Sequence, residues 1–360
     1  MALPTSGNSI SFLQIKNEFG IPPGFSFGAY RVQWSNTASG GSLSNQPLDT
    51  GIPQSGEIKF SDFYGKKLNV VVNFYDQDFM TGYTGQDIKT RFLSSAGFVT
   101  SVGGFQEDIP GNDDIVGAKV IADVNKRIGA RKKLYTPKSH TTNTCALVTG
   151  DWAANQELTI KVGPAGAIVG AGGDGGTGGG SGNIAGGNGD DGCSAIGINK
   201  ADTVVSIIND GQIRIGFGGG GGGSGKGENR SSGKKSSTYV TSSGGGGGGG
   251  AGIPAGIGAA GGPDPRAGGA GGNGKNRLEG GDGGLPGDSS GGGGHGGDYD
   301  AGIGAGGRAP SGSAAGAAGG IGGLHGFTIL TVQATNPAYS GSGVLLPANR
   351  TLQNQSNIDI

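Results

Sequence analysis

Short apolar runs rich in β-branched residues recur along the chain and predict β-strands. The clearest runs cover residues 68–74, 117–124 and 158–162, where apolar residues alternate with polar ones or follow one another directly. Turn-forming residues separate these runs, among them the Pro-Gly-Asn-Asp sequence at 110–113. The pattern predicts a β-rich spacer domain over residues 68–162, built as a small antiparallel sandwich or barrel.

The first 67 residues contain one amphipathic helix signal. Ser11 precedes a stripe of apolar residues and Gln14 follows three positions later, which is the spacing of a capping box. Gly20 and the two prolines that follow it end the pattern. We therefore predict a helix over residues 11–19. Its apolar positions are Phe12, Leu13, Ile15 and Phe19.

A second local signal lies at residues 57–64. Ile58 and Phe60 alternate with charged residues as in a half-buried strand, and Ser61 is placed to cap a single turn that presents Phe63 and Tyr64. A region of about 65 residues is marginally stable alone. We expect the aromatic residues of 1–67 to be buried against another domain or another chain, and we predict that this region is a docking module.

Glycine is concentrated in one part of the chain. Of the 86 glycines among 360 residues, 66 lie between residues 163 and 326. Several stretches run in triplets, such as Gly-Gly-Asp, Gly-Gly-Thr and Gly-Gly-Gly at 172–180. A period of three matches the polyproline-II type of helix, which forms no internal hydrogen bonds. Parallel copies can exchange backbone hydrogen bonds if no Cβ holds them apart, so the triplets predict packed polyglycine-II helices.

Apolar segments that precede the glycine blocks favour an ordered fold over a flexible linker. Aligned at Gly166 and Gly211, two of these segments share the apolar pairs Ile160/Val205, Val162/Ile207 and Ile168/Ile213. This is a duplicated β-turn-β unit, and residues 327–332 form a further strand that closes the stack. We predict a glycine-rich domain over 163–335 and a C-terminal tail over 336–360. The expected fold is mainly β with a polyglycine-II helix sandwich, a short N-terminal helix and little other α.

Charge and hydropathy exclude several classes of protein. A formal net charge of −1 provides no general attraction to nucleic acid or to an anionic membrane. No run of about 18 apolar residues is present, and the first residues lack the basic and apolar regions of a secretory signal. Cys145 and Cys193 are too few for a disulfide scaffold, and the pattern favours two buried thiols over a disulfide.

Candidate chemistry in the sequence is weak. Residues 186–193 approximate one copy of a calcium-binding nonapeptide, which makes Asp190 and Asp191 weak calcium candidates, but that motif works by stacking consecutive copies. A solvated turn is the favoured interpretation. The histidines lie far apart in the sequence and no nucleophile motif accompanies them. We predict no metal site, no cofactor and no enzymatic activity.

The apolar turn and the long glycine block resemble a known family. The strand, the Asn-Asp-Gly-x-Ile turn at 209–213 and the glycines at 218–223 resemble the glycine-rich domain of tail-fibre tip adhesins from T-even-type bacteriophages, over about residues 151–335. The sequences at 56–66 and 124–129 are similar to segments of virion structural and tail-fibre proteins of marine and cyanobacterial tailed phages. Residues 1–67 do not match the domain by which the adhesins clasp a separate fibre protein.

The resemblance implies a virion protein of the phage tail or tail fibre, assembled in the host cytoplasm. In that family, packed polyglycine-II helices end in loops that bind a host outer-membrane receptor, so the expected partners are an outer-membrane protein or surface glycan and other tail, fibre or baseplate proteins, with no nucleic acid and no membrane insertion. Candidate residues for virion docking are Phe12, Ile15, Phe19, Phe63 and Tyr64. Candidate receptor contacts are Arg230, Lys234, Lys235, Tyr239, Arg266, Lys275, Arg277, Leu278, His295, Tyr299 and Arg308.

Two alternatives remain open at this point. The same fold could serve as a structural protein of the tail, neck or baseplate that binds no receptor. Polyglycine-II helices could also form an ice- or surface-binding protein, although such a protein needs a flat, regular face of small residues, which the charged connectors at 226–243 and 263–279 interrupt.

Overall fold

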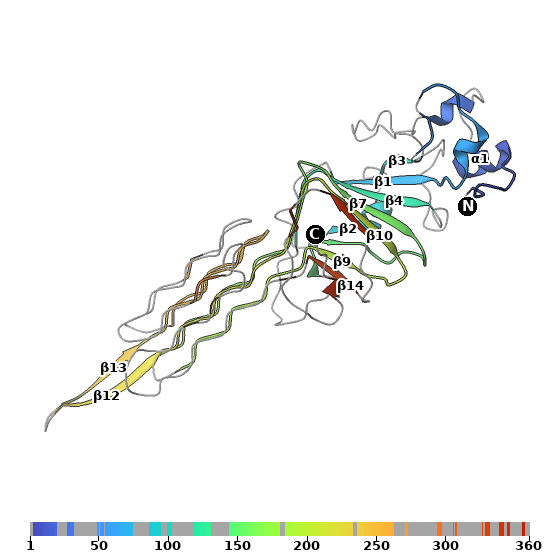
Figure 1. The fold of residues 1–360 in the computed structure, drawn as a ribbon. Helices are drawn as coiled ribbons and strands as arrows, with labels where there is room; N and C mark the ends of the chain where they lie inside the picture. Colours follow the sequence, from blue (N-terminus) through green and yellow to red (C-terminus); the bar gives the residue numbers. More distant parts are fainter. Residues whose placement is uncertain are drawn as a thin grey trace.

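The structure is a computed structural model of the 360-residue chain. It describes residues 3–19, 27–31, 49, 51–53, 55–74, 86–94, 99–102, 118–130, 144–180, 184–232, 236–262, 271–272, 294–296, 305, 307, 326, 328–331, 338–341, 344–345 and 355–356. The fold is mainly β with few helices, as the apolar runs predict. The molecule is long, with strands in the middle, helical turns at one end and extended glycine-rich segments leading to the other end (Figure 1).

Three sheets form the central part of the molecule. The first has the order β15-β10-β7-β4-β1-β3, with β1 at Asn69–Phe74, β3 at Val99–Val102, β4 at Lys119–Val124, β7 at Glu157–Val162, β10 at Val204–Asn209 and β15 at Ala338–Gly341. The second has the order β16-β11-β8-β5, with β5 at Arg127–Gly129, β8 at Ala167–Val169, β11 at Gln212–Arg214 and β16 at Val344–Leu345. The third has the order β17-β14-β9-β6-β2, with β2 at Gln86–Asp87, β6 at Leu147–Val148, β9 at Ile196–Ile198, β14 at Ile329–Thr331 and β17 at Gln355–Ser356.

The chain visits the three sheets in the same order several times, which defines a three-sided solenoid. One coil is β4-β5-β6, the next is β7-β8-β9 and the third is β10-β11-β14, with parallel pairing between coils. Inward-facing apolar residues stack from coil to coil, and the members of one such row are Val72, Ala122, Ile160 and Ile207. Ile128, Ile168 and Ile213 form an equivalent row in the second sheet. These rows belong to one continuous buried core.

The prediction of an antiparallel sandwich over 68–162 is wrong. Strands β1, β4 and β7 pair in parallel, and only β3 runs antiparallel to its neighbour β1 within this sheet's described ladders. The same sheets continue past residue 162, because β7 pairs with both β4 and β10. Strands β15 to β17 come from 336–360, the segment predicted to be a tail. The apolar runs are therefore parallel strands that occupy the same position in successive coils of the solenoid. The apolar pattern of a strand is the same whether its neighbour is parallel in a solenoid or antiparallel in a hairpin.

The duplicated β-turn-β unit is present with a different register. Strand β8 pairs with β11 as predicted, Ile168 opposite Ile213. Strand β7 is shifted by two residues relative to the prediction, because Ile160 lies opposite Ile207 instead of Val205. The shift arises because β7 and β8 are joined by residues 163–166 whereas β10 and β11 are joined by 210–211 alone. A shift of two keeps every side chain on its own face of the sheet.

The N-terminal region contains the predicted helix. Helix α1 spans Phe12–Phe19, and its capping box is formed: the Gln14 side chain accepts from the Ser11 backbone N–H at 2.7 Å, and Ser11 Oγ accepts from the Gln14 N–H at 3.3 Å. The strand expected around Ile58 and Phe60 is not formed: residues 57–59 are irregular, and a short 3-10 helix, η4 (Phe60–Phe63), begins at Phe60. Its first turn is closed by Asp62, which accepts from the Lys59 N–H at 2.7 Å, so Ser61 is not the cap. Two further helices are η2 (Phe27–Arg31) and α2 (Ile88–Ser94).

The glycine-rich chain leaves the solenoid at one corner in two consecutive coils. It departs between β8 and β9, and again between β11 and β14, and it runs as extended segments at 170–180, 184–195, 215–225, 243–250 and 254–262. These five stretches are called the glycine segments below. Strands β12 (Lys226–Ser232) and β13 (Ser236–Ser242) form a two-stranded sheet between the third and fourth of them.

Backbone hydrogen bonds between the glycine segments recur every third residue. The N–H groups of residues 173, 176 and 179 donate to the carbonyls of 217, 220 and 223, each at 2.8 Å. The N–H groups of 172, 175 and 178 donate to a different segment, at 254, 257 and 260. The carbonyls of 171, 174 and 177 accept from a third, at 193, 190 and 187. Segment 170–180 thus uses its three faces for three different neighbours.

Burial explains where the glycine runs are uninterrupted. Segments 215–225 and 243–250 are buried along their whole length, and these contain the continuous glycines 218–223 and 244–250. Segment 170–180 has one more open face, and its Gly-Gly-x triplets place Asp174 and Thr177 there. A Cβ on Gly219 would lie 2.0 Å from the Asp174 carbonyl oxygen, whereas one on Gly180 would meet only the Ile184 Cδ1 atom, at 3.4 Å.

A turn at Ile253 returns the glycine-rich chain to the solenoid. The Ile253 side chain is buried against Ala167 and Val169 of β8. Its N–H donates to the Gly170 carbonyl at 2.9 Å, and its carbonyl accepts from the Ala130 N–H at 2.9 Å. The glycine segments are therefore attached to the solenoid by this contact as well as by chain continuity.

Gly219→Ala is expected to lower the free energy of unfolding by about 1–3 kcal/mol, because the new methyl group would press on backbone that cannot move aside. The matched substitution Gly180→Ala should change it by less than about 0.5 kcal/mol, because only a flexible side-chain end lies nearby. Denaturant unfolding of the two variants checks this difference. Equal effects would contradict the packing described for the glycine segments.

Tyr30→Phe should reduce the loss of stability at alkaline pH. Tyr30 is buried among the rings of Phe12, Phe19, Phe27 and Phe63, and burial raises its pKa to about 12. An unfolded tyrosine titrates near pH 10, so between about pH 10 and 12 the unfolded state loses the proton first and stability falls as the pH rises. Relative to Tyr30→Phe, the wild type should lose about 1 kcal/mol more between pH 9 and 11. Identical pH profiles would refute this.

Candidate binding surfaces at the two ends of the molecule

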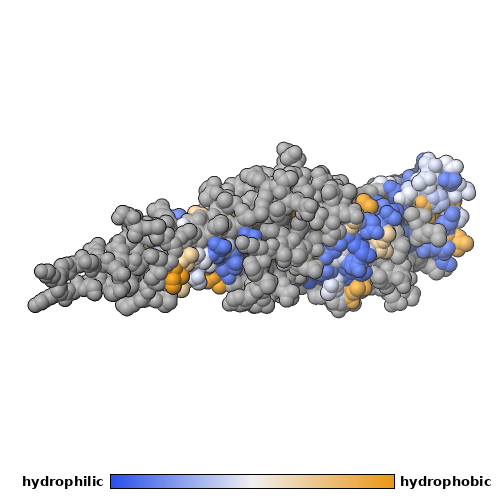
Figure 2. Space-filling view, turned by 90° about the horizontal axis from the view of Figure 1, so that it is seen from below, coloured by the Kyte–Doolittle hydropathy of each residue, from blue (hydrophilic) through white to orange (hydrophobic). Residues whose placement is uncertain are grey.

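The helix that carries several docking candidates and the hairpin that carries Arg230 and Tyr239 lie at opposite ends of the molecule. Helix α1 and the N-terminus are at one end, and strands β12 and β13 are at the other, with the solenoid and the glycine segments between them (Figure 1). On the face in Figure 2, the apolar surface of the coloured residues is scattered in small spots, with no single large patch.

The distal end is a β-hairpin with two strands and no covering layer among the described elements. Seven residue pairs form its ladder, from Lys226 opposite Ser242 to Ser232 opposite Ser236. Arg230 lies opposite Thr238, and Tyr239 lies opposite Asn229. Because strand positions alternate between faces, these two candidate receptor contacts occupy opposite faces of the hairpin.

His295 lies elsewhere, along the side of the glycine segments. It is exposed, whereas Gly294 and Gly296 on either side are buried. The Gly294 N–H donates to the Gly221 carbonyl at 2.7 Å and its carbonyl accepts from Gly248 at 2.9 Å, so His295 is not next to the hairpin strands. The other candidate receptor contacts lie outside the described residues, namely Lys234, Lys235, Arg266, Lys275, Arg277, Leu278, Tyr299 and Arg308.

The acidic candidates for calcium lie in a glycine segment. The Asp190 N–H donates to the Asp174 carbonyl at 2.8 Å, and the Asp190 carbonyl accepts from the Gly219 N–H at 2.9 Å. Asp190 is exposed and Asp191 is half-buried. Across the described ranges, no three metal-ligating side chains gather at one point. Asp190 thus contributes its backbone groups to the hydrogen-bonded bundle.

The buried thiols have no disulfide between them. Burial raises the pKa of the Cys145 thiol well above its ordinary value, the nearby Cys193 raises it further, and a hydrogen bond with Ser194 opposes this. A high thiol pKa keeps the reactive thiolate rare. Cys145 is therefore a packing residue at the junction between the solenoid and the glycine segments.

At the N-terminal end, three of the predicted docking residues are unavailable to a partner. Ile15, Phe19 and Phe63 are fully buried in the chain's own core, next to the residues of the solenoid. Phe12 and Tyr64 are half-buried. These residues are not docking residues, because the apolar face of α1 packs against the neighbouring part of the same chain. Among the described residues of this region, the large apolar side chains that remain exposed are Leu13, at 60 %, and Phe60, at 45 %.

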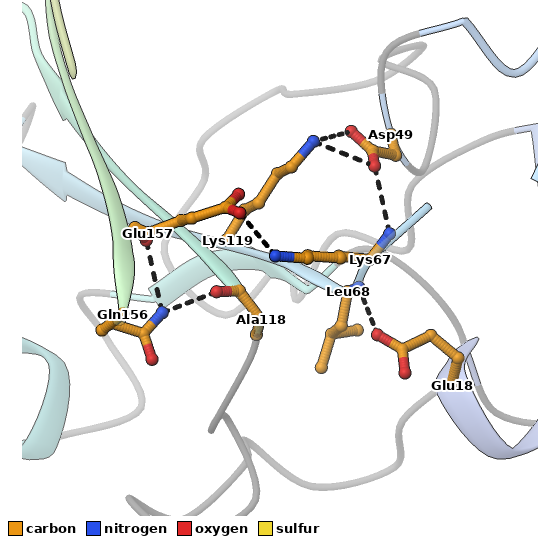
Figure 3. Close-up of polar contacts among 8 residues, drawn as sticks. All are labelled: Glu18, Asp49, Lys67, Leu68, Ala118, Lys119, Gln156 and Glu157. Carbon is orange, nitrogen blue, oxygen red and sulfur yellow. Dashed lines mark hydrogen bonds and ion pairs between the residues drawn. The ribbon is translucent and has the colours of Figure 1, made fainter. Parts of the chain in front are cut away.

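Charged residues join the N-terminal region to the solenoid at the edge where strands β4 and β7 begin (Figure 3). The Asp49 carboxylate is 2 % exposed and accepts from Lys119 Nζ at 2.9 and 3.1 Å and from the Lys67 N–H at 3.1 Å. Lys67 Nζ in turn pairs with Glu157 at 2.5 Å. Glu18 of α1 accepts from the Leu68 N–H at 2.8 Å. We call Glu18, Asp49, Lys67, Lys119 and Glu157 the polar cluster.

The sequence contains a signal for part of the polar cluster. Lys67, Lys119 and Glu157 each lie at or next to the start of an apolar strand run. Lys119 and Glu157 are also paired in register between adjacent coils. A charged residue at the same point of successive coils indicates a common edge. Asp49 and Glu18 have no such pattern, because they come from other elements.

Comparisons with known proteins add no relative: no protein-family model, curated protein or solved structure matches the chain. None of the helices in the described part of the chain combines the length and the apolar character needed to cross a bilayer.

Asp49→Ala is expected to lower the free energy of unfolding by about 2 kcal/mol, because it leaves Lys119 and the Lys67 N–H without their buried acceptor. Glu57→Ala is the matched control: its ion pair with Lys59 is exposed at both partners, so its loss should cost less than about 0.5 kcal/mol. Thermal or denaturant unfolding measures both. A neutral Asp49→Ala would show that the polar cluster does not hold the N-terminal region.

Proposed function

We propose that the chain is a non-enzymatic adhesin of a bacteriophage tail or tail fibre, which binds a host cell surface through its distal end. The observation that carries the proposal is the position of the β12–β13 hairpin, at the end of the molecule opposite the N-terminal region. A rigid scaffold that displays a small projecting element is a common design for recognition. The resemblance of residues 209–223 to the tip adhesins of T-even-type phages points the same way.

In this proposal the glycine segments are polyglycine-II helices packed as a sandwich. The support is the three-residue recurrence of their hydrogen bonds, with each face directed to a different neighbour. It also includes the burial throughout of the two segments, 215–225 and 243–250, that contain the longest uninterrupted glycine runs. Three residues per turn is the period of this helix type. Such a bundle would be stiff and would hold the hairpin away from the solenoid.

The N-terminal region would attach the chain to other proteins of the tail, fibre or baseplate. Its buried aromatic residues give the region a fixed shape, and among its described residues Leu13 and Phe60 are large, apolar and exposed to a partner. These two replace Ile15, Phe19 and Phe63 as docking candidates. The proposed location is the virion, after assembly in the host cytoplasm, and the proposed partner on the host is an outer-membrane protein or a surface glycan. Several copies on one particle would add avidity.

Replacing residues 226–242 with an Asn-Gly turn should abolish binding to cells without unfolding the rest of the chain. The glycine segments on either side are hydrogen-bonded neighbours, since the Gly223 N–H donates to the Gly245 carbonyl at 2.8 Å, so a short turn can join them. The measurement is saturable binding of labelled full-length chain to a panel of bacterial strains. We expect at least a tenfold loss in the hairpin variant.

The control carries Leu13→Ser and Phe60→Ser at the opposite end. It should bind cells as the wild type does but fail to join phage particles. Equal cell binding by the wild type and the hairpin variant would refute the proposed role of the hairpin. A folded wild-type chain that binds no strain would favour the alternative of a structural tail, neck or baseplate protein.

A further inference from the structure

The outer face of the first sheet carries two exposed apolar side chains on one strand. Among the described residues with large, exposed apolar side chains, only Val204 and Ile208 share a strand, β10, where they are 53 % and 37 % exposed. Both point away from the core, because side chains alternate between the two faces of a strand and the neighbouring Val205 and Ile207 are buried. Single exposed apolar residues are common on protein surfaces. Two on one strand face, with Ser206 between them, form an apolar row that the fold itself does not use.

Strand β7 adds a row of polar residues beside this apolar row. The register pairs are Glu157 with Val204, Thr159 with Ser206, and Lys161 with Ile208. The three β7 residues are partly exposed. The ammonium group of Lys161 has no ion pair within the described part of the chain. We call these six residues the β7–β10 face. It ends at β4, where Asp123 is buried.

The order of the residues along the two strands is self-complementary in one arrangement. Two copies can place this face together with their strands antiparallel, related by a two-fold axis that runs across the strands. Strand β7 then lies opposite β7, and β10 lies opposite β10. Lys161 of each copy faces Glu157 of the other, and Val204 of each copy faces Ile208 of the other. The two hydroxyl residues of the face meet their own counterparts at the axis.

The other two-fold arrangement, with the strands parallel, does not fit this face. It places β7 of one copy opposite β10 of the other. Glu157 would then face Val204, and Lys161 would face Ile208. Each charge would lose water against an apolar side chain without gaining a partner, which is unfavourable. The pattern of charges therefore selects the antiparallel arrangement.

We propose that two copies of the chain pair through the β7–β10 face with their strands antiparallel. In this dimer the Glu157 carboxylate accepts from Lys67 of its own chain and from Lys161 of the other, because its two oxygens can serve two ammonium groups. A face of six residues is smaller than the roughly 800 Å² that each partner buries in a standard interface, so the dimer is weak. The face lies in the solenoid and not at either end of the molecule, so the pairing is independent of the adhesin proposal (Figure 1).

The test is sedimentation velocity of the full chain between about 1 and about 300 μM, which covers a dissociation constant in the micromolar range. We expect the wild type to shift from monomer to dimer as its concentration rises. Val204→Lys and Ile208→Asp should each raise the dissociation constant by about tenfold or more, because a charge then meets an apolar side chain. Combined in one chain, the two substitutions should restore pairing, because the new lysine of each copy faces the new aspartate of the other.

The matched control is Ile257→Asp, which introduces the same charge at a position of similar exposure in the glycine segments, 48 %. It should pair as the wild type does. Circular dichroism and thermal melting establish that all variants are folded. A wild type that stays monomeric over the whole range would overturn the inference and leave the face to a different partner. Pairing lost equally in Ile257→Asp, or a double variant no better than the single ones, would overturn the proposed contacts.

Discussion

The distal half of the molecule depends on backbone groups approaching one another without intervening side chains. Neighbouring glycine segments are joined by N–H···O=C hydrogen bonds of 2.7–3.0 Å, at every third residue on a given face. A Cβ at an interior position such as Gly219 would overlap a neighbouring carbonyl oxygen. Glycine loses more conformational entropy on ordering than any other residue, and an extended segment of this kind has no hydrogen bonds of its own. Order in any one segment therefore requires its neighbours.

The solenoid provides the starting geometry for these contacts. Adjacent parallel strands lie about 4.8 Å apart, so segments that leave equivalent corners of neighbouring coils begin at hydrogen-bonding distance. The first such contact is already in place where the Gly170 N–H donates to the Arg214 carbonyl, at 3.0 Å. The turn at Ile253 then returns to the outer face of the second sheet and holds the bundle against it. Strand spacing in the core is thus transmitted directly into the glycine-rich part.

The elongated shape has a functional consequence for each end. At the N-terminal end, the polar cluster and the aromatic core hold α1, η2 and η4 against the solenoid, while Leu13 and Phe60 are exposed among the described residues. At the distal end, a charged hairpin emerges from a bundle that carries few side chains of its own (Figure 1). A bundle made mostly of glycine offers little for recognition, so specificity is assigned to what projects from it. This contrast between a glycine bundle with few side chains and a projecting hairpin is the physical basis of the adhesin proposal.

Local features of this protein could be predicted from the sequence alone. The capping box of Ser11 and Gln14 depends on residues that are close together in the chain. The apolar strand runs, and the pairing of Ile168 in β8 with Ile213 in β11, follow from a simple repeat in the sequence. Only the tertiary structure decided that the strands are parallel coils, that 336–360 adds strands to them, and that Ile15, Phe19 and Phe63 are buried within the chain. It also brought Asp49 to Lys119, 70 residues apart. Periodicity specifies which face of an element is apolar or charged, but the partner of that face is set by long-range register, which no local pattern encodes.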